Sequence, residues 1–225
     1  MPALTISKSQ IDKLGVRLRD HPNPDAADVE LYEEVLAAYE DALQLVVARL
    51  GMLGFAPTSR AKVLGTVIKK LRRQRSCGLS SVQDLVGARV VLEGDLDDQD
   101  AAVERFRGVL PIRKVIDRRI KPSAGYRAVH AVAKVDGIPV EVQFRTELQH
   151  TWAQIFEKLA DRLGRQIRYA GAPAQPNGEI IELMMNLSTN IASFEEFAFW
   201  PTRLRTTMPP TGCGVGWTRW RTESS

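Results

Sequence analysis

The segment VEVQFRT, residues 140–146, alternates apolar side chains with Glu141, Gln143 and Arg145. A carboxylate can accept a proton or bind a metal ion, and a guanidinium can bind phosphate. Alternation of this kind predicts a half-buried strand, whose polar row normally faces water. Two interpretations are therefore open: an ordinary solvated charge pair, or a polar row that faces a ligand.

Asp136 and Gly137 separate this segment from a second alternating run, GYRAVHAVAKV. Asp-Gly between two such runs predicts a two-residue hairpin with a type I′ turn. Counting back from the turn pairs His130 with Gln143, and a slip of one residue would exchange the two faces. The face predicted to be core consists of Val129, Ala131, Ala133, Val135, Ile138, Val140, Val142 and Phe144. The other face carries His130, Glu141, Gln143 and Arg145, with Tyr126 at its edge.

A helix is predicted to begin directly after this strand, because Thr146 and Gln149 have the spacing of a capping box. The following residues, QHTWAQIFEKLADRL, carry two stripes at helical spacing. The apolar stripe is Trp152, Ile155, Phe156, Leu159 and Leu163, and the polar stripe is His150, Gln154, Glu157 and Asp161. A helix that starts at the end of the strand can enclose the polar row in a cleft, which favours the ligand-facing interpretation.

The segment SRAKVLGTVIKKLRRQR predicts a basic amphipathic helix that Ser59 caps. Its predicted buried stripe is Val63, Leu64, Val67, Ile68 and Leu71. Its other stripe is Lys62, Thr66, Lys69, Lys70 and Arg73, and no acidic residue interrupts it. Such a stripe suits a polyphosphate or a nucleic-acid backbone, although an isolated basic helix is more often simply solvated.

Asp84 stands just before LVGARVVLE, which predicts a buried strand entered through Gly87, with Arg89 near its start. An aspartate in this position most often caps a helix. Together with a distant glutamate on a neighbouring strand, Asp84 could instead bind Mg²⁺, which prefers a few carboxylates and keeps water and phosphate as other ligands.

Composition bounds the class of protein. The chain has 225 residues, which is enough for one sizeable core with small helical additions. Its net charge is +4. No apolar run is long enough for a membrane span, and MPALTISKSQ lacks the apolar core of a signal peptide. Cys77 and Cys213 lie far apart, which argues against a disulfide framework or a zinc site. We expect a cytoplasmic protein.

The chain divides into four predicted parts. Residues 1–55 predict helices, and residues 56–170 predict a mixed core of helices and strands. A further amphipathic helix is expected in residues 171–200, packed on the core or in an oligomer interface. Residues 201–225 predict a basic, loosely ordered tail. The apolar stripes at 31–53 and 180–199 would permit a homo-oligomer, but packing within one chain explains them equally well.

Taken together, these segments resemble the synthetase domain of the RelA/SpoT-type alarmone synthetases, especially the small stand-alone ones. The resemblance runs from about Arg60 to Asp161. It rests on five motifs in the same order and spacing as in that family: RAKVLGTVIKKLRR, DLVGAR, GYRAVH, EVQFRT and HTWAQIFE.

The resemblance implies an α+β fold, a nucleotidyltransferase-like mixed sheet flanked by helices, with helical additions at both ends. It implies transfer of pyrophosphate from ATP to the 3′-hydroxyl of GDP or GTP, the reaction that makes the (p)ppGpp alarmones of the stringent response. The implied cofactor is Mg²⁺. Cationic side chains would bind the triphosphate and offset the charge that spreads during transfer.

The same resemblance implies roles for individual residues. Asp84 and Glu141 would be the catalytic carboxylates and metal ligands, and Glu141 is also the candidate acceptor of the hydroxyl proton. Tyr126 would stack on guanine. The implied ATP-binding residues are Arg60, Lys62, Lys70, Arg73 and Arg89. The implied acceptor-binding residues are Lys121, Tyr126, His130, Gln143 and Arg145.

Three departures from the family pattern open two alternatives. The loop from Lys121 to Tyr126 reads KPSAGY, one residue longer than the usual KPNGY and without the Asn, and Val63 replaces a Ser. DRRIK adds Arg118 and Arg119 upstream. One alternative is a toxin-like transfer of pyrophosphate to the 3′ end of tRNA. An RNA backbone would then meet Arg113, Lys114, Arg118, Arg119 and Lys121, with Trp217 and Trp220 of the tail assisting. The other is a catalytically inactive regulator that binds a nucleotide or a partner.

Hydrolysis of alarmones is not expected. The bifunctional relatives use metal-binding histidines and a His-Asp pair in an additional helical domain. This chain has three histidines, His21, His130 and His150, and none is followed by Asp. The sequence also offers no large C-terminal sensing region.

Overall fold

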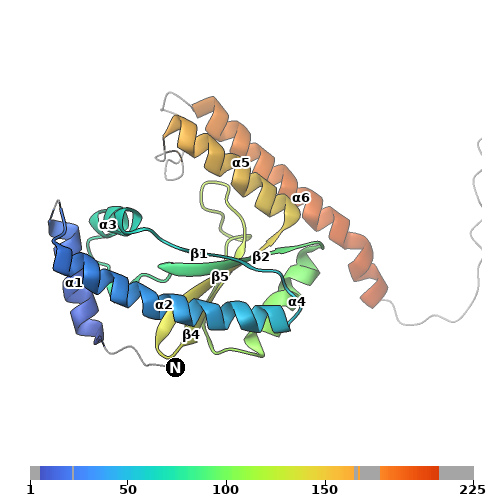
Figure 1. Cartoon of the computed structure of the whole chain (residues 1–225). Coiled ribbons are helices and arrows are strands. Elements are labelled where there is room, and N and C mark those ends of the chain that lie inside the picture. Colours follow the sequence, from blue (N-terminus) through green and yellow to red (C-terminus); the bar gives the residue numbers. More distant parts are fainter. Residues whose placement is uncertain (1–5, 22, 165–166, 168–177, 208–225) are drawn as a thin grey trace, which may run out of the picture.

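A five-stranded mixed sheet forms the centre of the computed structural model, which describes residues 6–21, 23–164, 167 and 178–207, the last ten as backbone only (Figure 1). The strands follow the order β1-β2-β5-β4-β3. They are β1 (Thr58–Ala61), β2 (Val86–Leu92), β3 (Ile112–Asp117), β4 (Val129–Val135) and β5 (Ile138–Thr146). Only the central pair, β2 and β5, is parallel. The predicted α+β class is confirmed.

Helices surround this sheet, and α2, α4 and α5 among them pack directly on its strands. They are α1 (Lys8–Asp20), α2 (Ala26–Met52), α3 (Leu64–Arg73), α4 (Leu96–Arg107), α5 (Glu147–Leu163) and α6 (Gly178–Thr207), with a short 3₁₀ turn, η1 (Leu79–Ser81). Helices α2 and α4 cover the apolar face of the hairpin, and the main core lies between them and the sheet. Helices α5 and α6 lie across the opposite face and share a smaller core built around Trp152 and Phe156 (Figure 1).

The predicted hairpin register is confirmed. Val135 pairs with Ile138, and His130 pairs with Gln143. The turn residues Asp136 and Gly137 have φ of 48° and 88°, the two positive values that a type I′ turn requires. All eight residues of the predicted core face are buried, so the polar row points away from the main core.

The start of α5 also matches its prediction. The Thr146 hydroxyl accepts from the backbone N–H of Gln149, and the Gln149 side chain accepts from the Thr146 N–H. Of the predicted apolar stripe, Ile155 stays 42% exposed. The reason is that α5 packs on α6 through Trp152, Ala153, Phe156 and Ala160, so its buried stripe is narrower than the sequence suggested.

The prediction of one basic helix from residue 59 onward was wrong at its start. Residues 58–61 form β1, which pairs antiparallel with β2, and α3 begins only at Leu64. Ser59 therefore caps nothing, and Val63 is exposed instead of buried. Residues 58–61 pair with the free edge of β2 and do not form a helix, because the four residue pairs between β1 and β2 stabilise the strand more than the weak helix propensity of this segment stabilises a helix. Val67 and Leu71 are buried as predicted.

The terminal helices show how their apolar stripes are used. The stripe of α2, from Tyr32 to Leu50, is buried in the main core, so packing within the chain accounts for it. Helix α6 buries Ile181 and Met184 against α5 but leaves Leu183, Phe194 and Phe197 exposed. It runs to Thr207, beyond the predicted end near residue 200. Residues 208–225, with Trp217 and Trp220, lie outside the described residues. Within the described ranges, no helix has the length and apolar character of a membrane span.

Candidate functional site

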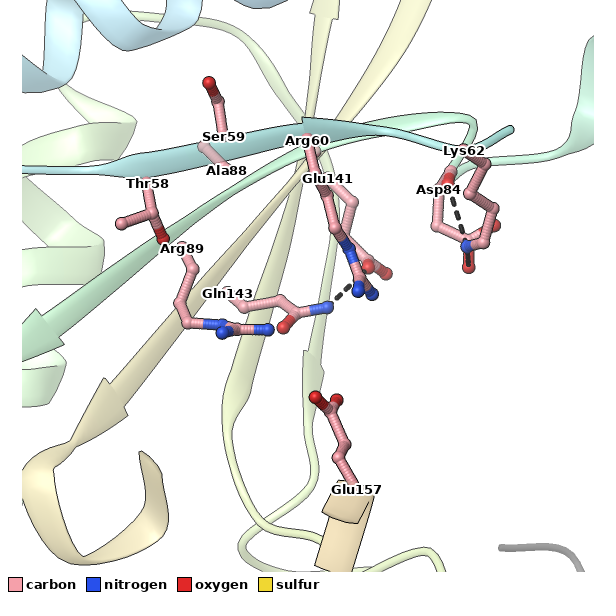
Figure 2. A pocket seen from close by; sticks show the side chains of 11 residues that line it. Thr58, Ser59, Arg60, Lys62, Asp84, Ala88, Arg89, Glu141, Gln143 and Glu157 are labelled. Carbon is pink, nitrogen blue, oxygen red and sulfur yellow. Dashed lines mark hydrogen bonds and ion pairs between the residues drawn. The ribbon is translucent and has the colours of Figure 1, made fainter. Parts of the chain in front are cut away.

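A pocket of about 250 Å³ opens on the polar face of the sheet, between β1, β2, β5 and α5 (Figure 2). Its lining residues are Thr58, Ser59, Arg60, Lys62, Asp84, Gly87, Ala88, Arg89, Glu141, Gln143 and Glu157. A second, wider hollow of about 480 Å³ shares Arg60, Asp84, Glu141, Gln143 and Glu157 with it. The second hollow adds Lys70, Arg118, Tyr126, His130 and Arg145. The two hollows together form one polar cleft.

Strand pairing brings these residues together from distant parts of the chain. Arg60 on β1 pairs with Gly87 on β2, which in turn pairs with Glu141 on β5. Two residues along, Arg89 pairs with Gln143, and Gln143 pairs with His130. Side chains at every second position share a face, so the polar residues of four strands meet in the cleft.

Two lysines hold Asp84 at one end of the cleft. The Lys62 ammonium forms an ion pair with the Asp84 carboxylate and donates to the Asp84 backbone carbonyl at 2.9 Å. Lys70 Nζ lies 2.5 Å from Asp84 Oδ1. Burial alone would raise the pKa of Asp84, but these two lysines outweigh it and lower that pKa. Burial lowers the pKa of Lys62, although its hydrogen bond to Asp84 acts in the opposite direction.

Glu141 lies in the middle of the cleft and is held by its neighbours on the polar row. His130 Nδ1 is 3.0 Å from Glu141 Oε1, and Gln143 Nε2 donates to Oε2 at 3.1 Å. Burial would raise the pKa of Glu141, but the hydrogen bonds from His130 and Gln143, with the positive charge of His130 when it is protonated, lower it below its ordinary value. The charge of Asp84 acts in the raising direction, because both carboxylates face the same cavity.

A chain of hydrogen bonds leads from Arg145 to Glu141. Arg145 Nη2 donates to the Tyr126 hydroxyl at 3.0 Å, and that hydroxyl lies 2.9 Å from His130 Nε2. An ionised carboxylate can only accept, so His130 Nδ1 donates to Glu141, and whenever the imidazole is neutral its Nε2 accepts from the Tyr126 hydroxyl. Every bond of the chain then points toward Glu141. The guanidinium of Arg145 also lies 4.9 Å from the centroid of the Tyr126 ring.

The Tyr126 ring is half-buried. Gly125 has a φ of +81°, and a Cβ there would lie 2.8 Å from the Trp152 ring, so only glycine fits this turn. The turn brings Tyr126 against α5. There it lines a hollow of about 160 Å³ together with Ser123, Trp152, Ala153, Phe156 and Glu157.

Positive charge is concentrated beside this chain. Burial, with the charges of Arg145 and Arg60, lowers the pKa of the Arg89 guanidinium. Among the described residues, Arg89 Nε, Arg145 Nε and His150 Nδ1 are buried without a hydrogen-bond partner. Arg60, Arg89 and Arg145 line the cleft, and clustered cations of this kind are suited to binding a phosphate group.

Residues 59–160 match the family described as "Region found in RelA / SpoT proteins". The chain is 34% identical over 206 residues to the uncharacterized proteins Rv1366 of Mycobacterium tuberculosis and Mb1401 of Mycobacterium bovis. That alignment covers 84% of this chain and 74% of each relative. The chain belongs to the RelA/SpoT family. The predicted family is thereby confirmed.

Solved structures share the fold of this RelA/SpoT chain at low sequence identity. The small alarmone synthetase 2 from Bacillus subtilis aligns with a TM-score of 0.63 and 19% identity, over 77% of this chain and 98% of that one. The small alarmone synthetase 1 from the same organism, bound to its product pppGpp, aligns with a TM-score of 0.62 and 20% identity. The alignment covers 80% of this chain and all of that one. The sheet and its flanking helices are therefore the fold of the small alarmone synthetases.

Most of the predicted site residues of this RelA/SpoT chain meet in the cleft. Arg73 and Lys121 do not line either hollow, and both are exposed. Arg60 and Lys62 reach the cleft from β1 and the residues after it, not from a helix. Glu157 was predicted only as part of a polar stripe, yet it points from α5 toward the sheet and lines both hollows (Figure 2).

The five basic residues considered for RNA binding lie along β3 and in the residues that follow it. Arg118 lines the wider hollow, whereas Arg113 and Lys114 line a different hollow with Arg107 along β3. Arg119 is paired with Asp117 and Asp100, at 2.6 Å and 2.7 Å. Of these five residues, Arg118 is the one that lines a hollow of the cleft.

Proposed function

We propose that this protein transfers pyrophosphate from ATP to the 3′-hydroxyl of GDP or GTP and so makes (p)ppGpp. One observation carries the proposal: Asp84 and Glu141, distant in sequence, line a single cavity with the cations Arg60, Lys62 and Arg89. The small alarmone synthetase 1 from Bacillus subtilis, which shares the fold, has been solved with pppGpp and with AMPCPP. Those ligands support nucleotide substrates for the present chain.

The donor triphosphate is proposed to bind beside β1 and α3. Arg60, Lys62 and Lys70 are the cations of this region that line the cleft. Lys62 and Lys70 now share Asp84, and an ammonium can exchange a carboxylate for a phosphate oxygen because both are anionic acceptors. Arg89, which lines the same cavity, would add a planar guanidinium donor for the transferred group.

Mg²⁺ fits the carboxylates of this cleft as a proposed cofactor. Among the described residues, no group of three or more His, Cys, Asp or Glu could hold a metal ion by itself. Mg²⁺ does not need such a group, since it commonly takes one or two carboxylates and completes its shell with phosphate and water. Asp84 and Glu141 would supply these carboxylates, and the bound ion would offset charge on the phosphates.

Glu141 is the proposed acceptor of the proton from the attacking hydroxyl. Its lowered pKa keeps it ionised near neutral pH, and an ionised carboxylate is ready to accept. His130 and Gln143 each hold one of its oxygens, which fixes the direction of the carboxylate. A carboxylate that is already held in one orientation loses less conformational freedom when it reaches the geometry for proton transfer.

The acceptor purine is proposed to bind against Tyr126, in the hollow that Trp152 and Phe156 also line. This hollow is mainly apolar and adjoins the polar row through Tyr126 and Glu157. A nucleotide whose base occupied it would place its ribose toward Glu141. The altered loop sequence is one reason to test tRNA beside GDP and GTP.

A transfer assay tests the proposal. Purified protein is incubated with γ-labelled ATP and Mg²⁺, and with GDP, GTP or deacylated tRNA in turn. Label on the guanine nucleotide is the expected result, and label on tRNA would favour the toxin-like alternative. No transfer to any acceptor, with Glu141→Gln indistinguishable from the unaltered protein, would replace the proposal with that of an inactive regulator.

A further inference from the structure

The loop that carries Tyr126 is fastened to helix α6. Ser188 Oγ donates to the backbone carbonyl of Gly125 at 2.5 Å, and Arg127 Nε donates to the same hydroxyl oxygen at 3.1 Å. Arg127 Nη1 donates to the carbonyl of Arg119 at 2.6 Å, which ties the two ends of the loop together. Ser188 is only 2% exposed, so water does not replace these bonds readily.

The atoms around the contact between Gly125 and Ser188 are closely packed. The absent Cβ of Gly125 would lie 2.8 Å from the Trp152 ring and 3.3 Å from Ser188 Cβ. Trp152 Nε1 donates to the carbonyl of Met184, one turn before Ser188 on the same helix. The loop, α5 and α6 therefore interlock at one point, directly beside Tyr126.

We propose that Ser188 is a positioning residue for the acceptor nucleotide, which rests on the function proposed above. Its hydroxyl acts as both donor and acceptor: it donates to the Gly125 carbonyl and accepts from Arg127 Nε. Removing it leaves a buried carbonyl and a guanidinium N–H unsatisfied, and the loop gains freedom next to Tyr126. Helix α6 thus acts on the acceptor side of the cleft without lining either polar hollow.

Ser188→Ala tests this role, with Thr189→Ala as the matched control. Thr189 is the next residue of α6, and its exposed hydroxyl donates only within the helix, to Met185, at 3.1 Å. The expected result for Ser188→Ala is a rise of roughly tenfold in the KM for GDP, with the KM for ATP unchanged. Thr189→Ala should leave both values unchanged. An equal rise in both KM values, or none, would overturn the proposal.

Hydrogen exchange tests the same contact without any nucleotide. The amides of Arg118 and Tyr126 are bonded within the loop, to Ala128 and Ser123. Ser188→Ala should speed their exchange at least several-fold relative to Thr189→Ala, since the fastening that closes the loop is lost. Unchanged exchange would refute the proposal even in an active enzyme. Faster exchange in a protein that transfers no pyrophosphate would support the claim that Ser188 holds the loop in place, and it would refute the proposed pyrophosphate transfer.

Arg127→Met provides a second variant in case Ser188→Ala destabilises α6. It removes the Arg127 Nε donor to the Ser188 hydroxyl and leaves the helix sequence intact. It should reproduce the GDP-specific rise in KM. The double variant should be no weaker for GDP than the worse single variant, because both remove one network. Additive effects would show that Ser188 and Arg127 act independently and would contradict the shared role.

Discussion

The two halves of the cleft are held in different ways. The donor half, residues 58–89, is organised by charge: Lys62 and Lys70 converge on Asp84, and Arg60 and Arg89 stand nearby. The acceptor half comprises residues 117–157 with α6. There, directed hydrogen bonds link Arg145, Tyr126, His130 and Glu141. Ser188 of α6 holds the loop before Tyr126 through its hydrogen bond to the Gly125 carbonyl.

This difference indicates how each half recognises its ligand. Ion pairs between flexible side chains are easily exchanged, so the cations of the donor half can turn from a carboxylate to a triphosphate. Bonds between buried, rigid groups keep their geometry, so the acceptor half can orient one hydroxyl toward Glu141. Substitutions should therefore affect ATP in the first half, GDP in the second, and turnover where the halves meet.

Glu141→Gln should have the largest effect, because Glu141 of the acceptor half lines the same cavity as Asp84 of the donor half, where the two halves meet. Loss of the proposed base is expected to lower kcat by about 10²–10⁴-fold. The amide keeps the size of the side chain, so the variant should fold, with a thermal midpoint somewhat lower because the charge that His130 and Gln143 stabilise is lost. Activity close to the unaltered level, measured with labelled ATP and GDP, would show that the two halves do not meet at this carboxylate.

Tyr126→Ala should weaken the acceptor half alone. Loss of a stacking face is worth ~1–3 kcal/mol in nucleic-acid systems, which corresponds to a rise of roughly tenfold or more in the KM for GDP. Tyr126→Phe is the matched variant, since it keeps the ring and removes only the hydroxyl that links Arg145 to His130. It should lower kcat and spare the KM for GDP. Equal losses in the two variants would mean that the ring itself contributes nothing.

Arg60→Gln should weaken the donor half alone. A hydrogen bond to a charged group is worth about 1.5–3 kcal/mol, so the KM for ATP is expected to rise about tenfold or more while that for GDP holds. Arg113→Gln is the control, because this exposed cation on β3 lines neither hollow of the cleft. A similar rise in the KM for ATP in both variants would show that ATP binding depends on the overall charge of the protein and not on a contact in the cleft.

Asp117→Asn should have the smallest effect and act on stability. Burial would raise the pKa of Asp117, but Arg119 outweighs it and lowers the pKa below the ordinary 3.8. The charged form then stabilises the fold at neutral pH, by about 1 kcal/mol for such a pair. This stabilisation is lost as the pH falls through the lowered value. Urea unfolding at pH 7 and pH 3 should therefore show a difference between the proteins that shrinks in acid.

The local features of the acceptor half were predictable from the sequence. The Asp136-Gly137 turn set the register of β4 and β5, and the Thr146 capping box set the start of α5. The donor half was less predictable. Residues 58–61 are too short and too polar to mark a strand by themselves, and they become one only because β2 offers them an unpaired edge. The fastening of the loop by Ser188 had no local signal either, since 63 residues separate it from Gly125.

By itself, the sequence determined which side chains share a strand face or a helix stripe, because periodicity and turn chemistry act over a few residues. Only the tertiary structure decided which faces meet. Parallel pairing of β2 with β5 placed Gly87 beside Glu141 and so brought Asp84 into the same cavity. That pairing spans more than fifty residues, and it depends on the burial of both strands under α2 and α4, a condition that no short segment carries.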